Sequence, residues 1–417
     1  MHKISTNQPS EKQIYFWNTL GGILNASFSV IIMVILTHIA GVYVAGIFSL
    51  GYSNAMMLQH IGSFDSRSYQ CSIFDKTLDF SVFLVFRIFT SLIMLLATLI
   101  LIRFFNYTGD KALATLILSL FCVAANISDI FQGNAQKSGR LDLAGKSLSF
   151  RIIFSVIIFY IVLSVSNDNL MLALSSITLF GFIWIIMFDI KKMVFEYPIV
   201  FSLNKTQFGK VFVNTFPLFL SLFSQMFIFN MPKYAIDNYM PVENQAIYGI
   251  LFMPASIVSL LATFLYRPIM VQLSHEWENK QYNIIIKTCL SRIFFVIVAI
   301  IIIVVGGAFF GPQVLTILYG TDVNSYRKEL IFLLIGGGFS GISVLLYYLM
   351  TIVKKQYYMV VAHFAILFFS WLVSYNLVNT YGLLGASLGY LFAIVALDIL
   401  LLCMLIIIFY HTMKGDE

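Results

Sequence analysis

Long apolar stretches alternate with short polar segments along almost the whole chain. A helix needs about 20 apolar residues to cross a hydrocarbon core of about 30 Å, and twelve segments approach or exceed that length. The first six cover residues 14–38, 43–62, 78–104, 112–134, 146–166 and 169–190. The second six cover residues 210–231, 245–270, 286–309, 329–350, 357–378 and 384–410. The pattern predicts an all-α polytopic membrane protein with about twelve transmembrane helices.

The segments between these stretches are short and leave no room for a soluble domain. The longest, residues 191–209, separates two groups of six predicted helices. We therefore expect an N-terminal six-helix bundle over residues 1–190, a cytoplasmic inter-bundle loop over 191–209, and a C-terminal six-helix bundle over 210–417. The first apolar stretch is too long for a cleavable signal sequence, so it is predicted to be the first span.

Composition and charge agree with a membrane protein and give its orientation. Hydrophobic residues make up 60% of the chain and charged residues 11%, against roughly 45–50% and 25% in a soluble domain. The net charge is +6, but the basic residues are spread over short loops, which argues against a nucleic-acid partner. With both termini in the cytoplasm, 19 of the 25 Lys and Arg residues lie inside, five lie outside, and Arg87 falls within a span. Basic loop residues stay cytoplasmic, so both termini are predicted to be cytoplasmic.

The two halves of the chain resemble each other, as in transporters built from repeats. An offset of 200 residues aligns residues 46–67 with residues 246–267 without a gap, and pairs predicted span two with span eight. Identical residues in this alignment are Ile47/Ile247, Ala55/Ala255, Phe64/Phe264 and Arg67/Arg267. The alignment predicts a duplication of six helices.

The sequence offers little that could support catalysis. The segment 139–147 has five residues between its glycines where a phosphate-binding loop needs four, and no strand precedes it. No metal-ligand or nucleophile motif is present, so we expect no cofactor and no metal. A membrane glycosyltransferase or polymerase would need a long outer loop to hold its acceptor, and every predicted outer loop is short. The sequence predicts that the protein is not an enzyme.

Ionisable residues within the predicted spans are costly and are candidates for function. Arg87 lies about ten residues into the third span and either lines a polar cavity or has a structural partner. Asp129 makes the fourth span polar, and Asp398 is a lone carboxylate in the twelfth. Both are candidates for coupling to H⁺ or Na⁺, with a polar packing network as the alternative for Asp129. Arg151 and Arg292 lie near cytoplasmic ends, where arginine reaches the lipid headgroups.

Arg67 and Arg267 occupy matching cytoplasmic ends of the two predicted repeats. Guanidinium groups bind diphosphate through paired hydrogen bonds. The pair is therefore a candidate for holding an anionic lipid headgroup at the mouth of a cavity. The alternative is that each arginine anchors its loop on the cytoplasmic side.

Several short segments resemble bacterial polysaccharide transporters of the Wzx kind, and the likeness extends over essentially the whole chain. The segments are Asn214-Thr215-Phe216-Pro217-Leu218, Asn230-Met231-Pro232-Lys233-Tyr234-Ala235-Ile236-Asp237, Gly46-Ile47-Phe48, Arg67-Ser68-Tyr69-Gln70 and Tyr266-Arg267-Pro268-Ile269. The chain departs from the family at Cys71-Ser72-Ile73, where a Val-Ser-Asp-like continuation is expected. No role for an acidic residue is therefore carried over to that place.

The resemblance implies a fold, a cargo and a location. The family belongs to the multidrug/oligolipid/polysaccharide exporter superfamily, whose two six-helix bundles rock around a central cavity. The implied cargo is an undecaprenyl-diphosphate-linked oligosaccharide, flipped from the cytoplasmic to the outer leaflet of the bacterial inner membrane for O-antigen, capsule or exopolysaccharide assembly. A polysaccharide polymerase is the implied protein partner.

A cationic lining suits such a cargo. We expect Arg67, Arg87, Lys233 and Arg267 to contact the diphosphate headgroup at successive stages. Tyr234 could stack on a sugar face, although packing is the commoner role of an aromatic residue in a chain that is 16% aromatic.

Two other functions remain open. A cation-coupled small-molecule extruder on the same fold would need a membrane carboxylate such as Asp129 or Asp398. A membrane glycosyl polymerase is disfavoured by the short outer loops.

Overall fold

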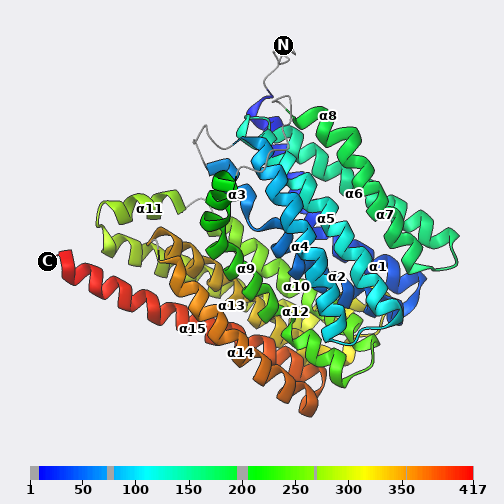
Figure 1. Cartoon of the computed structure of the whole chain (residues 1–417). Coiled ribbons are helices and arrows are strands. Elements are labelled where there is room, and N and C mark those ends of the chain that lie inside the picture. Colours follow the sequence, from blue (N-terminus) through cyan, green and yellow to red (C-terminus); the bar gives the residue numbers. More distant parts are fainter. Residues whose placement is uncertain (1–8, 73–78, 195–204, 267–269, 354, 417) are drawn as a thin grey trace. The chain divides into compact units, whose positions relative to one another are not determined.

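The computed structural model describes residues 9–72, 79–194, 205–266, 270–353 and 355–416, and within these ranges the chain forms helices and no strand (Figure 1). The chain divides into two compact units, residues 1–219 and 220–417. The boundary between the units falls within helix α9 (Lys205–Tyr239). Each unit is therefore described by itself.

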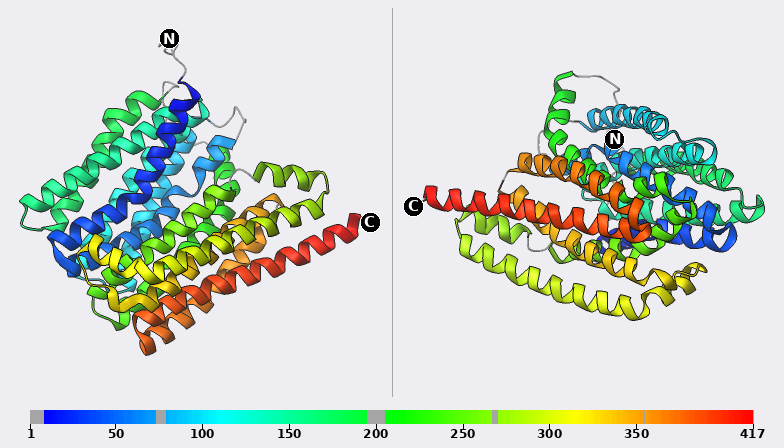
Figure 2. Two further views of the ribbon diagram at one scale, coloured as in Figure 1. Left: turned by 180° about the vertical axis from the view of Figure 1, so that it is seen from behind. Right: turned by 90° about the horizontal axis from the view of Figure 1, so that it is seen from below.

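Unit 1 holds the first six long helices and the start of α9 (Figure 2). Its helices are α1 (Glu11–Ile39), α2 (Gly41–Ser63), α3 (Ser66–Ser72), α4 (Phe80–Phe104), α5 (Gly109–Lys137), α6 (Leu141–Val165) and α7 (Leu170–Trp184). A π-helical turn, Ile185–Asp189, joins α7 to the short α8 (Ile190–Met193).

Unit 2 contains the rest of α9 and six further helices. They are α10 (Glu243–Tyr266), α11 (Met270–Glu278), α12 (Tyr282–Tyr319), α13 (Arg327–Ile352), α14 (Gln356–Tyr381) and α15 (Leu383–Asp416). A 3₁₀ turn, Asn324–Tyr326, precedes α13.

The helices confirm a multi-pass membrane protein. In the described residues, eleven helices are long and apolar enough to span a bilayer, and α10, with 24 residues, occupies the place of predicted span eight. Large apolar side chains such as Phe104, Phe310 and Ile317 are exposed on these helices. A soluble surface would not tolerate apolar area on this scale, so these side chains face lipid.

Several predicted boundaries were wrong. Helix α9 runs to Tyr239 although its span was predicted to end at residue 231, and α12 covers 38 residues although residues 286–309 were predicted. Pro232 and Pro312 lie inside these helices rather than at their ends. Proline is tolerated within membrane helices because neighbouring groups satisfy the freed backbone carbonyl. The apolar pattern also missed the two short helices α3 and α11.

Several helix contacts of unit 1 recur in unit 2. In unit 1, α2 packs on α4 and α5, α5 on α7, and α6 on α7. In unit 2, α10 packs on α12 and α13, α13 on α15, and α14 on α15. The short helix also repeats, because α3 lies against α4 and α5 whereas α11 lies against α12 and α13.

Glycine sets a close helix contact of unit 2, between α10 and α13. A methyl group added at Gly337 of α13 would lie 2.5 Å from the carbonyl oxygen of Ala255 on α10. One added at Gly341 would lie 2.8 Å from the Cβ atom of Ala262. The glycine pair therefore lets the backbones of α10 and α13 approach, as small residues do between membrane helices.

Candidate functional site

Two arginines and one aspartate from three helices meet in unit 1. Nη1 of Arg67, at the start of α3, lies 2.7 Å from Oδ1 of Asp129 on α5. Nη2 of Arg87, on α4, lies 3.2 Å from Oδ2 of the same carboxylate. Each carboxylate oxygen thus receives one guanidinium. We call Arg67, Arg87 and Asp129 the arginine–aspartate cluster.

Polar side chains surround the cluster. Arg67 donates to Oε1 of Gln132 at 3.3 Å and to Oε1 of Gln136 at 3.0 Å, and Arg87 donates to Oγ of Ser66 at 3.0 Å. These partners hold both guanidinium groups on the polar face of α5. These contacts account for the polar residues around Asp129 in the predicted fourth span.

The cluster carries more positive than negative charge. Two guanidinium groups share one carboxylate, and the Arg87 side chain is 0% exposed whereas those of Arg67 and Asp129 are 28% and 31% exposed. In the described residues, Nε and Nη1 of Arg87 have no hydrogen-bond acceptor. Burial alone would lower the pKa of Arg67, but the Asp129 carboxylate outweighs it and the pKa stays above its usual value. The guanidinium of Arg67 therefore stays charged and partly exposed.

An unusual turn places Arg67. Helix α2 ends at Ser63, and both Phe64 and Asp65 adopt φ angles of 48°. Residues other than glycine rarely adopt this left-handed region, so packing must hold the turn. The buried Phe64 ring stacks on Phe219 with 4.2 Å between ring centroids.

Segments that carry the family resemblance meet at this turn. Nδ2 of Asn214 on α9 donates to the hydroxyl of Tyr69 on α3 at 2.9 Å. Nε2 of Gln70 donates to the carbonyl oxygen of Ile130 on α5 at 3.4 Å. A side chain at Gly133 would collide with Gln70, so glycine there lets α3 approach α5. These contacts fix α3, and with it Arg67.

A second buried network in unit 1 was missed by the sequence reasoning. Arg151 was predicted to reach the lipid headgroups, but it is buried, and Asp189 supplies the main negative charge acting on it. Oγ of Ser147 donates to Oδ1 of Asp189 at 2.6 Å and accepts from Nε1 of Trp184 at 3.0 Å. Asp189 ends the π-helical turn. Its position at the end of predicted span 169–190 was the available signal.

Asp398 is the buried carboxylate of unit 2. It lies on α15 and accepts a hydrogen bond from Ser343 of α13. In the described part of the chain its second oxygen has no hydrogen-bond partner. The rings of Tyr266 and Tyr390 also lie near it and are fully buried. The structure therefore places this predicted residue in a mostly apolar core.

The remaining candidates belong to the part of the sequence assigned to unit 2. Lys233 was predicted in an outer loop, but it lies within α9, where Nε2 of Gln245 donates to its carbonyl oxygen at 2.7 Å. Tyr234 is 2% exposed and its ring centroid lies 5.6 Å from that of Phe227. Arg267 lies outside the described residues. The roles of these three residues stay predictions.

The described residues hold no group of three or more His, Cys, Asp or Glu side chains that could bind a metal ion.

The chain has recognisable relatives among known proteins. No protein-family model matches it. It is 26% identical over 302 residues to the capsular polysaccharide biosynthesis protein CapF of Staphylococcus aureus. The aligned region covers 70% of this chain and 74% of CapF.

Solved structures of other proteins share the fold of this chain. A multidrug resistance MATE family transporter of the MOP superfamily, in an inward-facing conformation, superposes with a TM-score of 0.70 at 12% identity, over 94% of this chain and 96% of that chain. The lipid II flippase MurJ superposes with a TM-score of 0.68 at 15% identity, over 96% of this chain and 88% of that one. The chain is a multi-pass membrane protein with the fold of the exporter superfamily.

Proposed function

We propose that the protein is a flippase for polyprenyl-diphosphate-linked oligosaccharides, working by alternating access in a bacterial cytoplasmic membrane. The observation that carries the proposal is the arginine–aspartate cluster. It presents the partly exposed guanidinium of Arg67 on the side of unit 1 that the basic residues predict to be cytoplasmic. A diphosphate headgroup would enter from that side.

The relatives support this cargo. The name of CapF places it in capsule biosynthesis, and MurJ is described as a flippase of lipid II. Transfer of a sugar headgroup through hydrocarbon would cost several kcal/mol for each unsatisfied polar group. A cavity open to lipid at one side would hydrate the headgroup while the polyprenyl tail stays in the bilayer. We assign Arg67 to first contact with the diphosphate and Arg87, Lys233 and Arg267 to later stages.

The test is translocation of a fluorescent lipid-linked oligosaccharide in proteoliposomes, read out by access of an external enzyme to the sugar. We expect exposure of the label to depend on the protein. Arg67→Ala should slow it about ten- to a hundredfold, because a charge-assisted hydrogen bond contributes about 1.5–3 kcal/mol. Arg67→Lys should be intermediate, since lysine keeps the charge and loses the paired geometry.

The control is Arg292→Ala, which removes an exposed arginine from α12. It should leave translocation unchanged. Equal rates for Arg67→Ala and the wild type, with both proteins stably folded, would contradict the role of Arg67. Absence of protein-dependent exposure with several glycans would contradict the flippase itself.

A second function, cation-coupled extrusion of small molecules, is favoured by the MATE transporter fold and by the buried carboxylate Asp398. The same proteoliposomes distinguish it. Movement of small cations under a pH or Na⁺ gradient, without exposure of any lipid-linked glycan, would support extrusion.

A further inference from the structure

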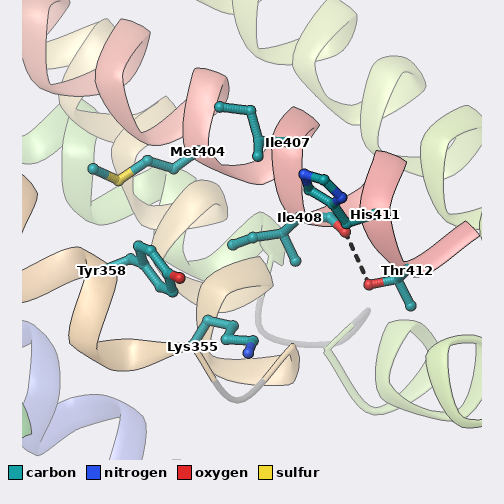
Figure 3. Close-up of a pocket in the computed structure, with 7 residues that line it drawn as sticks. All are labelled: Lys355, Tyr358, Met404, Ile407, Ile408, His411 and Thr412. Carbon is teal, nitrogen blue, oxygen red and sulfur yellow. Dashed lines mark hydrogen bonds between the residues drawn. The ribbon is translucent and has the colours of Figure 1, made fainter. Parts of the chain in front are cut away.

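A groove lies in unit 2 where α14 begins and α15 ends. Its volume is about 370 Å³. Met404, Ile407 and Ile408 of α15 form its apolar wall, and Lys355 and Tyr358 border it from the start of α14 (Figure 3). All the residues that line the groove belong to unit 2.

The other end of the groove is polar. His411 and Thr412 of α15 complete its lining, and none of the described side chains that line it is acidic. Oγ1 of Thr412 already donates to the carbonyl oxygen of Ile408 at 2.8 Å, so it can only accept from a ligand. The ammonium group of Lys355 and the positive end of the α14 helix dipole therefore make the groove electropositive where α14 begins.

Aromatic rings mark the depth of the groove in the membrane. The ring centroids of Trp277 and Tyr282 lie 5.1 Å and 6.2 Å from that of Phe409, which directly follows Ile408. Tryptophan and tyrosine are enriched at the level of the lipid headgroups. The groove runs from Met404 to His411, about 10 Å at 1.5 Å per residue, and therefore crosses this level from the apolar to the aqueous side.

We propose that this groove binds an anionic phospholipid of the surrounding leaflet. Its phosphate lies at Lys355 and the start of α14, and one acyl chain lies along Met404, Ile407 and Ile408. Both charge and shape favour this occupant, because a free anion would leave the apolar wall unused and a zwitterionic lipid would bring a second cation close to Lys355. The lipid holds the ends of α14 and α15 together.

The test uses the full-length protein in nanodiscs or detergent, with retained lipids counted by native mass spectrometry. We expect phosphatidylglycerol to bind more tightly than phosphatidylcholine. Lys355→Gln should weaken phosphatidylglycerol about fivefold, as one basic contact at a membrane surface would, and weaken phosphatidylcholine, whose phosphate is offset by its own cation, much less. Lys287→Gln, at an exposed lysine of α12, is the matched control and should change neither.

A second variant tests the apolar wall. Met404→Trp should fill the groove and weaken both phospholipids, while the protein keeps its melting temperature. Equal binding of phosphatidylglycerol by Lys355→Gln and Lys287→Gln would overturn the proposal. Competition by millimolar inorganic phosphate would also overturn it, because the site would then be one for free anions.

Discussion

At the scale of single residues, Asp129 holds the arginine–aspartate cluster together, because its carboxylate pairs with both arginines. It is the one carboxylate in direct contact with both Arg67 and the fully buried Arg87 among the described ion pairs. The sequence identified all three residues as candidates, because charges within apolar stretches are easy to find. It could not pair them, since they lie on three helices whose packing only the fold supplies.

The pairing gives a stability prediction. Asp129→Asn would leave Arg87 buried without an opposite charge, so we expect a loss of about 2–3 kcal/mol. This is below the full cost of breaking a buried pair because Asp129 is partly exposed. The measurement is thermal unfolding of the purified protein.

Asp110→Asn, an exposed substitution on the same helix, is the control and should change little. Adding Arg87→Met to Asp129→Asn should recover part of the loss, because no uncompensated buried charge remains. A melting temperature of Asp129→Asn equal to that of Asp110→Asn would show that the cluster does not stabilise unit 1.

Asp398 gives a prediction about coupling. Its carboxyl group has one hydrogen-bond donor, Ser343, and a second oxygen without a partner in the described residues, so it can take up and release a proton. Asparagine keeps the shape and cannot titrate. In proteoliposomes, Asp398→Asn should abolish any dependence of transport on a pH gradient, whereas Asp168→Asn, at an exposed position, should not. A full pH response in Asp398→Asn would exclude this carboxylate as the coupling group.

At the scale of helices, apolar length predicts where the spans lie and fails to predict where they end. The twelve predicted spans all coincide with helices, but α9 and α12 extend well beyond them. A prediction from composition ends a span at proline or polar residues. The helix itself can continue through them, because neighbouring groups satisfy the backbone. The buried position of Arg151 escaped prediction for a related reason, because the carboxylate whose charge acts on it, Asp189, comes from a turn almost 40 residues further on.

The packing of α1 on α6 gives a prediction about close helix contact. A methyl group at Gly145 of α6 would lie 2.5 Å from the carbonyl oxygen of Trp17 and 2.7 Å from the amide nitrogen of Asn18. Backbone atoms cannot move aside as a side chain can, so Gly145→Ala should destabilise unit 1 by about 1–3 kcal/mol. Thermal unfolding measures the loss.

Gly22→Ala on α1 is the matched control. A methyl group there meets nothing within 4 Å, so alanine should be neutral or stabilise the helix by up to about 1 kcal/mol. If Gly145→Ala were as stable as Gly22→Ala, the close approach of α1 and α6 would be wrong.

At the scale of the whole molecule, the two units share a packing scheme and differ in chemistry. In unit 1, α5 carries Asp129 of the arginine–aspartate cluster, whereas α13, which makes similar contacts in unit 2, carries glycines and Ser343 beside Asp398. The sequence repeat predicted the common scheme from residues 46–67 and 246–267. It did not predict the difference, because the two halves align over only a short stretch.

The distribution of basic residues predicts the orientation of the molecule. With 19 of 25 Lys and Arg residues assigned inside, a fluorescent protein that matures only in the cytoplasm should fluoresce when fused to the C-terminus. An alkaline phosphatase fused at the same place should be inactive. The reverse pair of results would invert the assignment of Arg67 to the cytoplasmic side.

The length of α12 predicts that the transport rate depends on the thickness of the membrane. Its 38 residues measure about 57 Å at 1.5 Å per residue, and apolar side chains remain exposed as far as Ile317. The stretch that follows Arg292, residues 293–317, measures about 38 Å against a hydrocarbon core of about 30 Å. The helix must therefore tilt by about 40°, or bend, for which Pro312 provides a site, or the bilayer beside it must swell. Vesicles of increasing acyl-chain length should change the transport rate, and an unchanged rate would mean that the bend absorbs the whole mismatch.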